Sequence, residues 1–208
     1  MSHELPRTAS LRALRRCMES YCPLEHDTWR QLESLCVIES LEAGAFFCAQ
    51  GVVPSSFGFV YQGLLRGFTS SDAGREYNKV FFPEATFPGS MVALLTRAPS
   101  TFAIQAVERS AVVRIDFPGY RRLLEARADL KWFQILYLEK NWLLAKEPRE
   151  VALVQDNATQ RYLRFLQEHP GLEARLTQYH VASHLGVTPT QLSRIRRELG
   201  KKVDPSST

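Results

Sequence analysis

The 208-residue sequence lacks long hydrophobic runs, and none of its apolar segments reaches the roughly eighteen residues that a membrane-spanning helix needs. Its opening stretch, MSHELPRTASLRALRR, also lacks the apolar core of a secretory signal. These two absences predict a cytoplasmic protein with no membrane partner. A chain of this length has room for one sizeable hydrophobic core and a second, smaller domain.

Signatures of catalysis and of metal binding are also missing. The sequence contains no GxSxG, Walker or HExxH motif, so we expect no enzyme. No histidine occurs between His26 and His169, which argues against a cupin-like metal centre in the middle of the chain. His180 and His184 lie four residues apart without a third ligand, and we expect packing or phosphate contact from them. The sequence therefore predicts no metal site.

Cysteine is scarce, and its four copies all lie in the first quarter of the chain, at Cys17, Cys22, Cys36 and Cys48. Their spacing matches no CxxC ligand pattern, and a disulfide framework is unusual in a reducing cytoplasm. We expect ordinary thiols. A redox-sensing role for this group stays open as an alternative.

The spacing of apolar residues changes near Leu41. Within residues 5–39 these residues recur at helical intervals, as Leu11, Leu14 and Met18 do. Beyond Leu41 the chain consists of short apolar segments separated by glycines, a pattern typical of the short strands of a sandwich or roll. Residues 5–39 are therefore predicted to be helical and the part from Leu41 onward to be a β-roll.

The strand pattern continues to about residue 117. It predicts strands at residues 102–107 and 111–115 and a hairpin tip at residues 71–74. Pro118-Gly119 is expected to end the strands, after which the spacing is helical again.

Between Leu130 and Val154 the apolar residues cover more than one face of the predicted helix. A helix with two apolar faces needs two neighbours. We expect one to be the β-roll of the same chain and the other to be the same helix of a second copy, in a two-fold homodimer. Burial within a monomer is the alternative, and Pro148 predicts a bend. The expected dimer contacts are Trp132, Phe133, Leu136, Tyr137 and Leu144.

The stretch Thr177–Lys202 predicts two short helices joined by a tight turn. Thr177 is placed to cap the first helix, and Gly186 is placed to end it. Residues 188–191, TPTQ, form a capping box with proline at the first helical position, so the second helix begins at Pro189. Gly200 is expected to end this helix. The pattern is typical of a helix-turn-helix.

The two predicted helices have apolar residues on facing sides, namely Val181, Ala182, Leu185, Leu192, Ile195 and Leu199. The second helix also has a polar face, formed by Thr190, Ser193, Arg194, Arg197 and Lys201. The whole chain carries a formal net charge of only +4, but its cations are concentrated here. This face suits a DNA major groove; an amphipathic hairpin with a solvated charged side is the alternative.

Five segments are similar to successive parts of the cyclic-AMP receptor protein/FNR (CRP/FNR) family of bacterial transcription regulators. They are LEAGAFFCAQG, VYQGLLRGF, GREYNKVFFPEATFPGS, RYLRFLQEHPGL and HVASHLGVTPTQLSRIRREL. The resemblance implies an α+β fold. Its parts would be an N-terminal β-roll of the double-stranded jelly-roll type, like a cyclic-nucleotide-binding domain, a long dimerisation helix and a C-terminal winged-helix-like helix-turn-helix. The expected divisions are 1–125, 126–155 and 156–202, with a disordered tail at 203–208.

The resemblance also implies an effector site, but the motif differs. Family members that bind cyclic nucleotides have a phosphate cassette that begins with Gly-Glu and ends with Arg-Ser. The run GSMVALLTRAPST keeps Gly89 but has Ser90 in place of Glu and Ser100-Thr101 in place of Arg-Ser. Without that arginine the charge-assisted phosphate contact is lost, so we expect another small anionic or nucleotide effector. The predicted pocket residues are Gly89, Ser90, Met91, Arg97, Ser100 and Thr101.

The residues expected to contact DNA bases also differ from the family pattern. Where family members have Arg and Glu early in the recognition helix, this sequence has Pro189 and Thr190, while Arg194 matches the later Arg. Arg194 is the leading candidate to read a base, with guanine as its expected partner. The full predicted set is Thr188, Thr190, Gln191, Ser193, Arg194, Arg197 and Lys201. The expected partners are double-stranded DNA, a second copy and RNA polymerase; the alternative is a small-molecule sensor whose terminal helices dock a protein.

Overall fold

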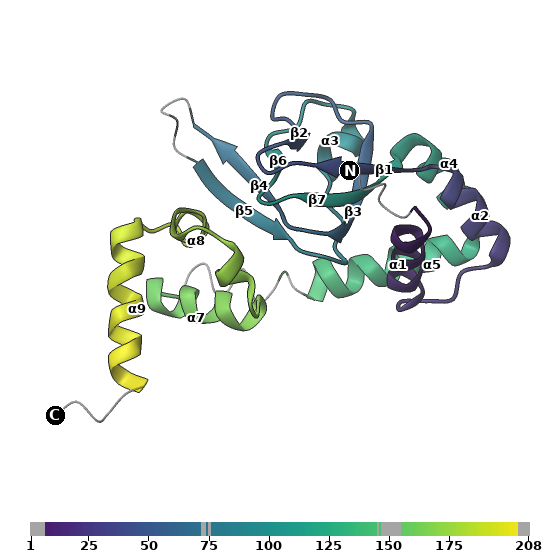
Figure 1. Ribbon diagram of the computed structural model, residues 1–208. Coiled ribbons are helices and arrows are strands. Elements are labelled where there is room, and N and C mark those ends of the chain that lie inside the picture. Colours follow the sequence, from purple (N-terminus) through teal and green to yellow (C-terminus); the bar gives the residue numbers. More distant parts are fainter. Residues whose placement is uncertain (1–6, 72–73, 75, 145, 147–154, 204–208) are drawn as a thin grey trace, which may run out of the picture.

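The computed structural model describes residues 7–71, 74, 76–144, 146 and 155–203, with the side chains of 201–203 left out (Figure 1). Two antiparallel sheets form its centre. The first has the strand order β1-β7-β3 and the second the order β2-β6-β4-β5. The strands are β1 (Cys36–Leu41), β2 (Phe46–Cys48), β3 (Ser56–Gln62), β4 (Leu65–Ser70), β5 (Glu76–Phe82), β6 (Ala103–Ala106) and β7 (Ser110–Asp116). The predicted β-roll, with a hairpin between β4 and β5, is confirmed.

The interior between the sheets is filled by apolar side chains. Phe47, Leu65 and Ile104 are each at most 5% exposed and belong to one cluster. Alternation along β4 sends Leu65 into this interior and Arg66 to the opposite face. Since fully burying a side chain of this kind contributes about 1.5–3 kcal/mol, the interior holds the two sheets in a fixed relation.

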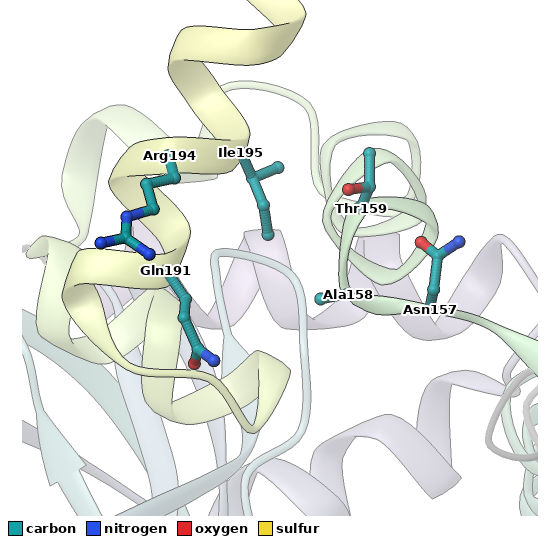
Figure 2. Close-up of a pocket in the computed structure, with 6 residues that line it drawn as sticks. All are labelled: Asn157, Ala158, Thr159, Gln191, Arg194 and Ile195. Atoms are coloured by element: carbon teal, nitrogen blue, oxygen red, sulfur yellow. The ribbon is translucent and has the colours of Figure 1, made fainter.

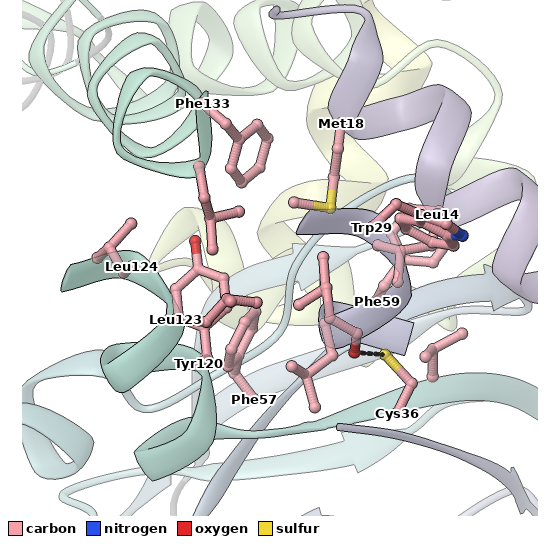
Figure 3. Packing of buried hydrophobic residues seen from close by; sticks show 14 of the residues in the cluster. Leu14, Met18, Trp29, Cys36, Phe57, Phe59, Tyr120, Leu123, Leu124 and Phe133 are labelled. Atoms are coloured by element: carbon pink, nitrogen blue, oxygen red, sulfur yellow. Dashed lines mark hydrogen bonds between the residues drawn. The ribbon is translucent and has the colours of Figure 1, made fainter. Parts of the chain in front are cut away.

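Helices cover one end of the roll. They are α1 (Arg7–Glu19), α2 (His26–Ser34), the short α3 (Met91–Thr96), α4 (Phe117–Ala126) and α5 (Ala128–Leu138). Leu14 and Met18 of α1 meet Phe59 of β3 and Phe133 of α5 in a single buried cluster (Figure 3). The helical spacing of the first residues therefore reflects one face of α1 turned toward this core.

Two predicted boundaries are wrong. Residues 36–39 are not helical, because Cys36 pairs with Ile115 and opens the strand β1; the β-branched residues that follow fit a pleated sheet better than a helix. The strands do end before Pro118, since β7 stops at Asp116, but the helix begins at Phe117 and not after Gly119. Pro118 lies in the first turn of α4, which Asp116 caps by accepting the backbone N–H of Gly119 at 2.7 Å.

The predicted dimer helix begins as α5 and passes into a π-helical turn, η1 (Glu139–Leu143). The side-chain amide of Asn141 donates to the carbonyl oxygen of Tyr137 at 2.9 Å and to the hydroxyl of Tyr21 at 3.0 Å, which ties this turn to the end of α1. The expected bend at Pro148 lies outside the described residues.

One side of this helix is apolar and is left exposed by the residues that the structure describes. Its large residues are between 41% and 71% exposed: Trp132, Ile135, Leu138, Trp142, Leu143 and Leu144. Leu136 is half-buried. Phe133 and Tyr137 lie on the other side and pack against Phe87 and Tyr21, so they contribute to packing within the chain. The two apolar faces inferred from the sequence are both present.

The C-terminal unit is formed by α7 (Ala158–Glu168), a 3-10 turn η2 (Leu172–Arg175), α8 (Gln178–Leu185) and α9 (Pro189–Val203). From Gln155 to Val203 the described residues include helices and turns but no strand. Helix α9 lies on the far side of this unit from the sheets (Figure 1). It continues through Gly200, which was predicted to end it, because glycine also tolerates ordinary helical backbone angles. No described helix is long and apolar enough to span a bilayer.

Candidate nucleic-acid interface

The helix-turn-helix predicted from the sequence is present with its caps. Thr177 accepts the backbone N–H of His180 at 3.2 Å, and Gly186 ends α8 in the left-handed conformation with φ 66°. Thr188 and Gln191 bond reciprocally at 2.8 and 3.1 Å, which is the predicted capping box at the start of α9. These contacts fix the turn, and with it the direction in which α9 leaves α8.

Packing then fixes which face of α9 points outward. Leu192 and Ile195 are buried against Val181 and Leu185 of α8, together with Tyr162 of α7. The side-chain amide of Gln178 also donates to the carbonyl oxygen of Pro189 at 2.6 Å, which joins the starts of α8 and α9. The opposite face of α9 has no neighbour in the described part of the chain, and it is exposed at Thr190, Gln191, Ser193, Arg194 and Arg197.

The three arginines of α9 fall into two groups. Arg196 faces inward, where it pairs with Glu173 at 2.5 Å and stacks over the ring of Tyr162. Arg194 and Arg197 are exposed, and no ion pair reaches either of them within the described residues. Two cations on one face of the helix are therefore available to an external anion.

Two residues of the predicted DNA-binding set, Gln191 and Lys201, differ from the others in what the structure shows of their side chains. The side-chain oxygen of Gln191 is engaged by the cap, so its amide nitrogen is what remains for a partner. Lys201 lies in α9, but its side chain is outside the described part, and its phosphate contact stays a prediction.

The start of α7 lies beside α9. An open hollow of about 330 Å³ is lined by Asn157, Ala158 and Thr159 from α7 and by Gln191, Arg194 and Ile195 from α9 (Figure 2). A capping box between Asn157 and Gln160 uses the N–H groups of those two residues. Helix geometry leaves the N–H groups of Ala158 and Thr159 without an acceptor in the helix. The spacing of Asn157 and Gln160 in the sequence is that of a capping box, but spacing alone does not show that this cap lies beside Arg194.

Helix α8 contacts the roll through its other face. The Ser183 hydroxyl donates to the carbonyl oxygen of Glu76 at 2.7 Å and accepts the backbone N–H of Asn78 at 3.1 Å. His184 bonds the carbonyl oxygen of Asn78 through Nδ1 at 2.8 Å. His180 and His184 thus belong to the contact between the helix-turn-helix and β5, which agrees with the expected packing role. Within the described residues no group of three or more His, Cys, Asp or Glu is placed to hold a metal.

A second contact joins the same two units. The Arg175 guanidinium binds both oxygens of Glu84 at 2.9 Å and Glu108 at 2.6 Å. Glu84 also accepts the backbone N–H of Gly63 at 2.8 Å. The hydrogen bonds from Arg175 lower the pKa of Glu84 below its ordinary value of 4.5. The carboxylate is therefore ionised, and the contact present, at neutral pH.

Four of the predicted effector residues surround α3. Gly89 and Met91 flank Ser90, which is buried at the start of this helix. Arg97 caps the other end, exposed and with φ 55°. A six-residue helix separates the two ends by about 9 Å. The described structure therefore does not place Arg97 beside Ser90.

Ser100 and Thr101 lie in the following loop. Ser100 is 2% exposed, and its hydroxyl donates to the carbonyl oxygen of Phe102 at 2.6 Å, whereas Thr101 is exposed. The Ser100 hydroxyl is thus committed to the loop, and the predicted effector pocket stays a prediction.

The four cysteines are free thiols. Burial raises the pKa of Cys36 to about 12 and also raises the pKa of Cys17, Cys22 and Cys48. A thiol with a raised pKa has little thiolate at neutral pH and is a poor nucleophile. These environments favour the ordinary thiols expected from the sequence.

The Glu84–Arg175 contact predicts a pH dependence of stability. Because the pKa of Glu84 is lowered on folding, its stabilisation is complete above 4.5 and is lost as the pH falls through the lowered value. Glu84→Gln should lower the melting temperature at pH 7, modestly because the pair is partly exposed. The difference from wild type should shrink between about pH 5 and about pH 3, as followed by circular dichroism. Glu125→Gln, at a looser exposed pair, is the control; a difference that grows on acidification would contradict the assignment.

Comparisons with known proteins agree with this architecture. Residues 38–127 match the cyclic nucleotide-binding domain family model. FixK2 from Bradyrhizobium japonicum is 14% identical with a TM-score of 0.69, covering 83% of this chain and 89% of that one. The c-di-GMP responsive global regulator CLP of Xanthomonas campestris is 15% identical with a TM-score of 0.66, covering 86% and 93%.

The Thermus thermophilus catabolite activator protein is 18% identical with a TM-score of 0.52, covering 89% of this chain and 87% of that one. No curated protein matches the sequence significantly. Identities this low establish the fold and leave individual residues to be judged on their own surroundings. Residues 38–127 are thus similar to the cyclic nucleotide-binding domain family, and the chain as a whole has the fold of CRP/FNR-type transcription regulators.

Proposed function

We propose that this protein is a dimeric, DNA-binding transcription regulator in which α9 enters the major groove. The observation that carries the proposal is the outward face of α9, where Arg194 and Arg197 have no ion-pair partner among the described residues while Arg196 is held inward. An exposed arginine suits the two acceptors of guanine in the major groove, and phosphates attract both cations.

The roles on α9 follow from position. Thr190, Ser193 and Arg194 lie in its first two turns, the part that a helix-turn-helix points toward base edges. Thr188 lies just before the helix and is suited to a backbone phosphate. Arg197 lies further along, where the helix leaves the groove floor, and is suited to phosphate as well. Arg194 therefore carries the main base contact.

The start of α7 supports a further phosphate contact. The N–H groups of Ala158 and Thr159 border the hollow that Arg194 also lines. No acidic residue lies in the first turn of α7, and the carboxylate of Asp156, just before the cap, is paired with Arg164 at 2.7 Å. A phosphate in this hollow would fix the distance between the DNA backbone and α9.

Dimerisation is proposed through the exposed side of α5 and η1. A group of large apolar residues exposed along one helix indicates an interface. Trp132, Ile135, Leu138 and Trp142 recur every three or four residues, as in a helix pair. A two-fold pair would present two copies of α9 to half-sites about one helical turn of DNA apart. RNA polymerase is a further partner that this architecture suggests.

The β-roll is proposed to sense a small effector other than cyclic AMP. Ser90 and Ser100 replace the residues that hold the nucleotide in cyclic-AMP-binding members, and Ser100 is occupied with Phe102. The effector would be a small anion or another nucleotide.

The DNA proposal predicts different effects for two arginines. Arg194→Ala should weaken binding to the preferred site by roughly 1–3 kcal/mol and relax selection at one base of each half-site. Arg197→Ala should weaken binding to all sequences alike and reduce the salt slope by about one. Selection from a randomised duplex pool, followed by fluorescence anisotropy at several salt concentrations, measures both.

Arg122→Ala is the matched control for lost charge, because Arg122 is exposed on α4 at the other end of the molecule (Figure 1). It should behave as wild type. If Arg194→Ala weakened every duplex equally, Arg194 would be a phosphate contact. If the wild-type protein bound no duplex in the pool with an affinity that depends on salt, the DNA proposal would be wrong. The alternative, in which the terminal helices dock a protein, would then be favoured.

The dimer proposal predicts that Leu138→Glu weakens self-association by at least about tenfold, because two carboxylates would meet in the apolar contact. Leu138 is already 41% exposed in the single chain, so the variant should fold normally. Leu95→Glu, at a 60% exposed residue of α3, is the control. Sedimentation equilibrium should give a dimer for wild type and control. A monomeric wild type at micromolar concentration, with and without DNA, would refute the arrangement.

The effector proposal predicts that cyclic AMP raises the melting temperature no more than adenosine does, since a ligand stabilises only the state that binds it. A thermal-shift screen of nucleotides and small anions tests this. A saturable rise specific to cyclic AMP would show that Ser90 and Ser100 can substitute for the missing groups.

A further inference from the structure

We infer that the contact between α8 and β5 is acid-sensitive, so that protonation of His180 opens the hydrogen bonds by which α8 is docked on the β-roll. The α8–β5 contact is defined here as His180, Ser183 and His184 of α8 against Glu76 and Asn78 of β5. This inference concerns the two units of one chain and does not depend on the proposed DNA binding.

Strand β5 is an edge of its sheet, in the order β2-β6-β4-β5. An edge strand has backbone groups without a neighbouring strand to bond them. At Asn78 the backbone N–H is accepted by Ser183 and the carbonyl oxygen is bonded by His184, while Ser183 also reaches the carbonyl oxygen of Glu76. Side chains of α8 thus replace the missing strand, and Asn78 is fully buried as a result.

His180 lies at the centre of this contact. Its carbonyl oxygen accepts the side-chain amide of Asn78 at 3.2 Å. The ring is half-buried, and its Nδ1 has no hydrogen-bond partner among the described residues. A buried nitrogen without a partner is tolerable while it is neutral, at the cost of one lost hydrogen bond.

The groups that face His180 oppose a positive charge there. From β4 comes Arg66, which is 6% exposed and is held by Gln105 and by Glu76 of β5, the latter at 2.6 Å. On α8 itself, Tyr179 lies beside the ring with centroids 6.1 Å apart, and His184 follows one turn later. Glu76 is already paired with Arg66, so it offers an imidazolium less than a free carboxylate would.

Protonation of His180 would therefore place a charge on a half-buried ring whose Nδ1 has no acceptor, within electrostatic reach of the Arg66 guanidinium. Burial first, and Arg66 second, lower the pKa of His180 below its ordinary value of 6.5, while Glu76 acts in the opposite sense. A lowered pKa in the docked state means that docking is strongest above 6.5 and weakens as the pH falls toward the lowered value. Because one proton is taken up, the ratio of the open to the docked contact rises at most about tenfold per pH unit.

The Arg175 contact stays intact over this range. Glu84 has a pKa below 4.5, so it remains ionised while His180 titrates. These two polar contacts between the units therefore respond in separate pH windows, and the α8–β5 contact weakens first; the apolar contact of Phe81 with Phe165 does not titrate.

The backbone amide of Asn78 reports directly on docking, because its acceptor is the Ser183 hydroxyl of the other unit. We expect its protection against hydrogen exchange, measured by NMR and corrected for the intrinsic rate, to fall roughly tenfold or more between about pH 7.5 and about pH 5.5. The amide of Val113, inside the other sheet, should keep its protection. In His180→Gln, which cannot be protonated, the protection of Asn78 should change less than about twofold.

His26→Gln is the matched control, since His26 is exposed on α2 outside the contact, and it should respond as wild type does. Arg175→Gln, which loses the second contact at every pH, should show lower protection of Asn78 throughout. If His180→Gln does not dock at neutral pH, the wild-type titration decides: His180 ring shifts and Asn78 protection should share one midpoint below 6.5. Separate midpoints, or an equal fall in His180→Gln, would overturn the inference.

Discussion

The helices of the C-terminal unit are too short to be stable alone, and this constraint determines how the unit is built. A helix of eight residues such as α8 is marginal in water and persists only by burying one face. Val181 and Leu185 bury that face against Leu192 and Ile195 of α9. Once the inner faces are committed to the core, the outer face of α9 must remain in solvent. The arginines that stand on it, Arg194 and Arg197, are available because the core has taken the other side.

The same constraint gives α8 a second neighbour. Its remaining face carries His180, Ser183 and His184, whose polar atoms meet the unpaired backbone of β5. The backbone groups of an edge strand need hydrogen-bond partners, and a short helix needs packing contacts to be stable. The contact between α8 and β5 therefore stabilises both units. The orientation of the helix-turn-helix relative to the roll therefore depends on these polar groups, on the Arg175 ion pairs and on the apolar cluster in which Phe81 of β5 packs against Phe165 of α7. The polar part of this contact responds to pH and salt more readily than the apolar part does.

The two halves of the chain differ in how much of their apolar surface they bury against their own residues. The roll fills its interior with its own side chains, such as Phe47 and Ile104, and α1 and α4 cover one end of it. Helix α5 and the π-turn after it leave an apolar side uncovered instead, with Trp132 and Trp142 more than half exposed. The roll thus supplies a rigid support, and the surfaces left for partners are the apolar side of α5 and the polar face of α9.

The sequence by itself determined the local structure wherever a side chain forms a hydrogen bond with the backbone of a residue close to it in the sequence. The caps at Thr177, Asn157 and Thr188 and the turn at Gly186 were predictable because their hydrogen bonds span three or four residues. The strand pattern and the two faces of α5 were predictable from apolar spacing. The prediction from the sequence was wrong at Cys36, where pairing with Ile115 overrides the helical pattern. It was also wrong at Gly200, because a glycine permits a helix to end but does not force it to end.

Only the tertiary structure decided what depends on distant parts of the chain. It turned Arg196 inward to Glu173 and left Arg194 outward, although the two are neighbours in the sequence. It placed the start of α7 beside α9, His180 beside Arg66, and Arg97 at the opposite end of α3 from Ser90. Spacing along a helix predicts which residues share a face. Which face finds a partner depends on contacts between segments a hundred residues apart, and no local pattern records them.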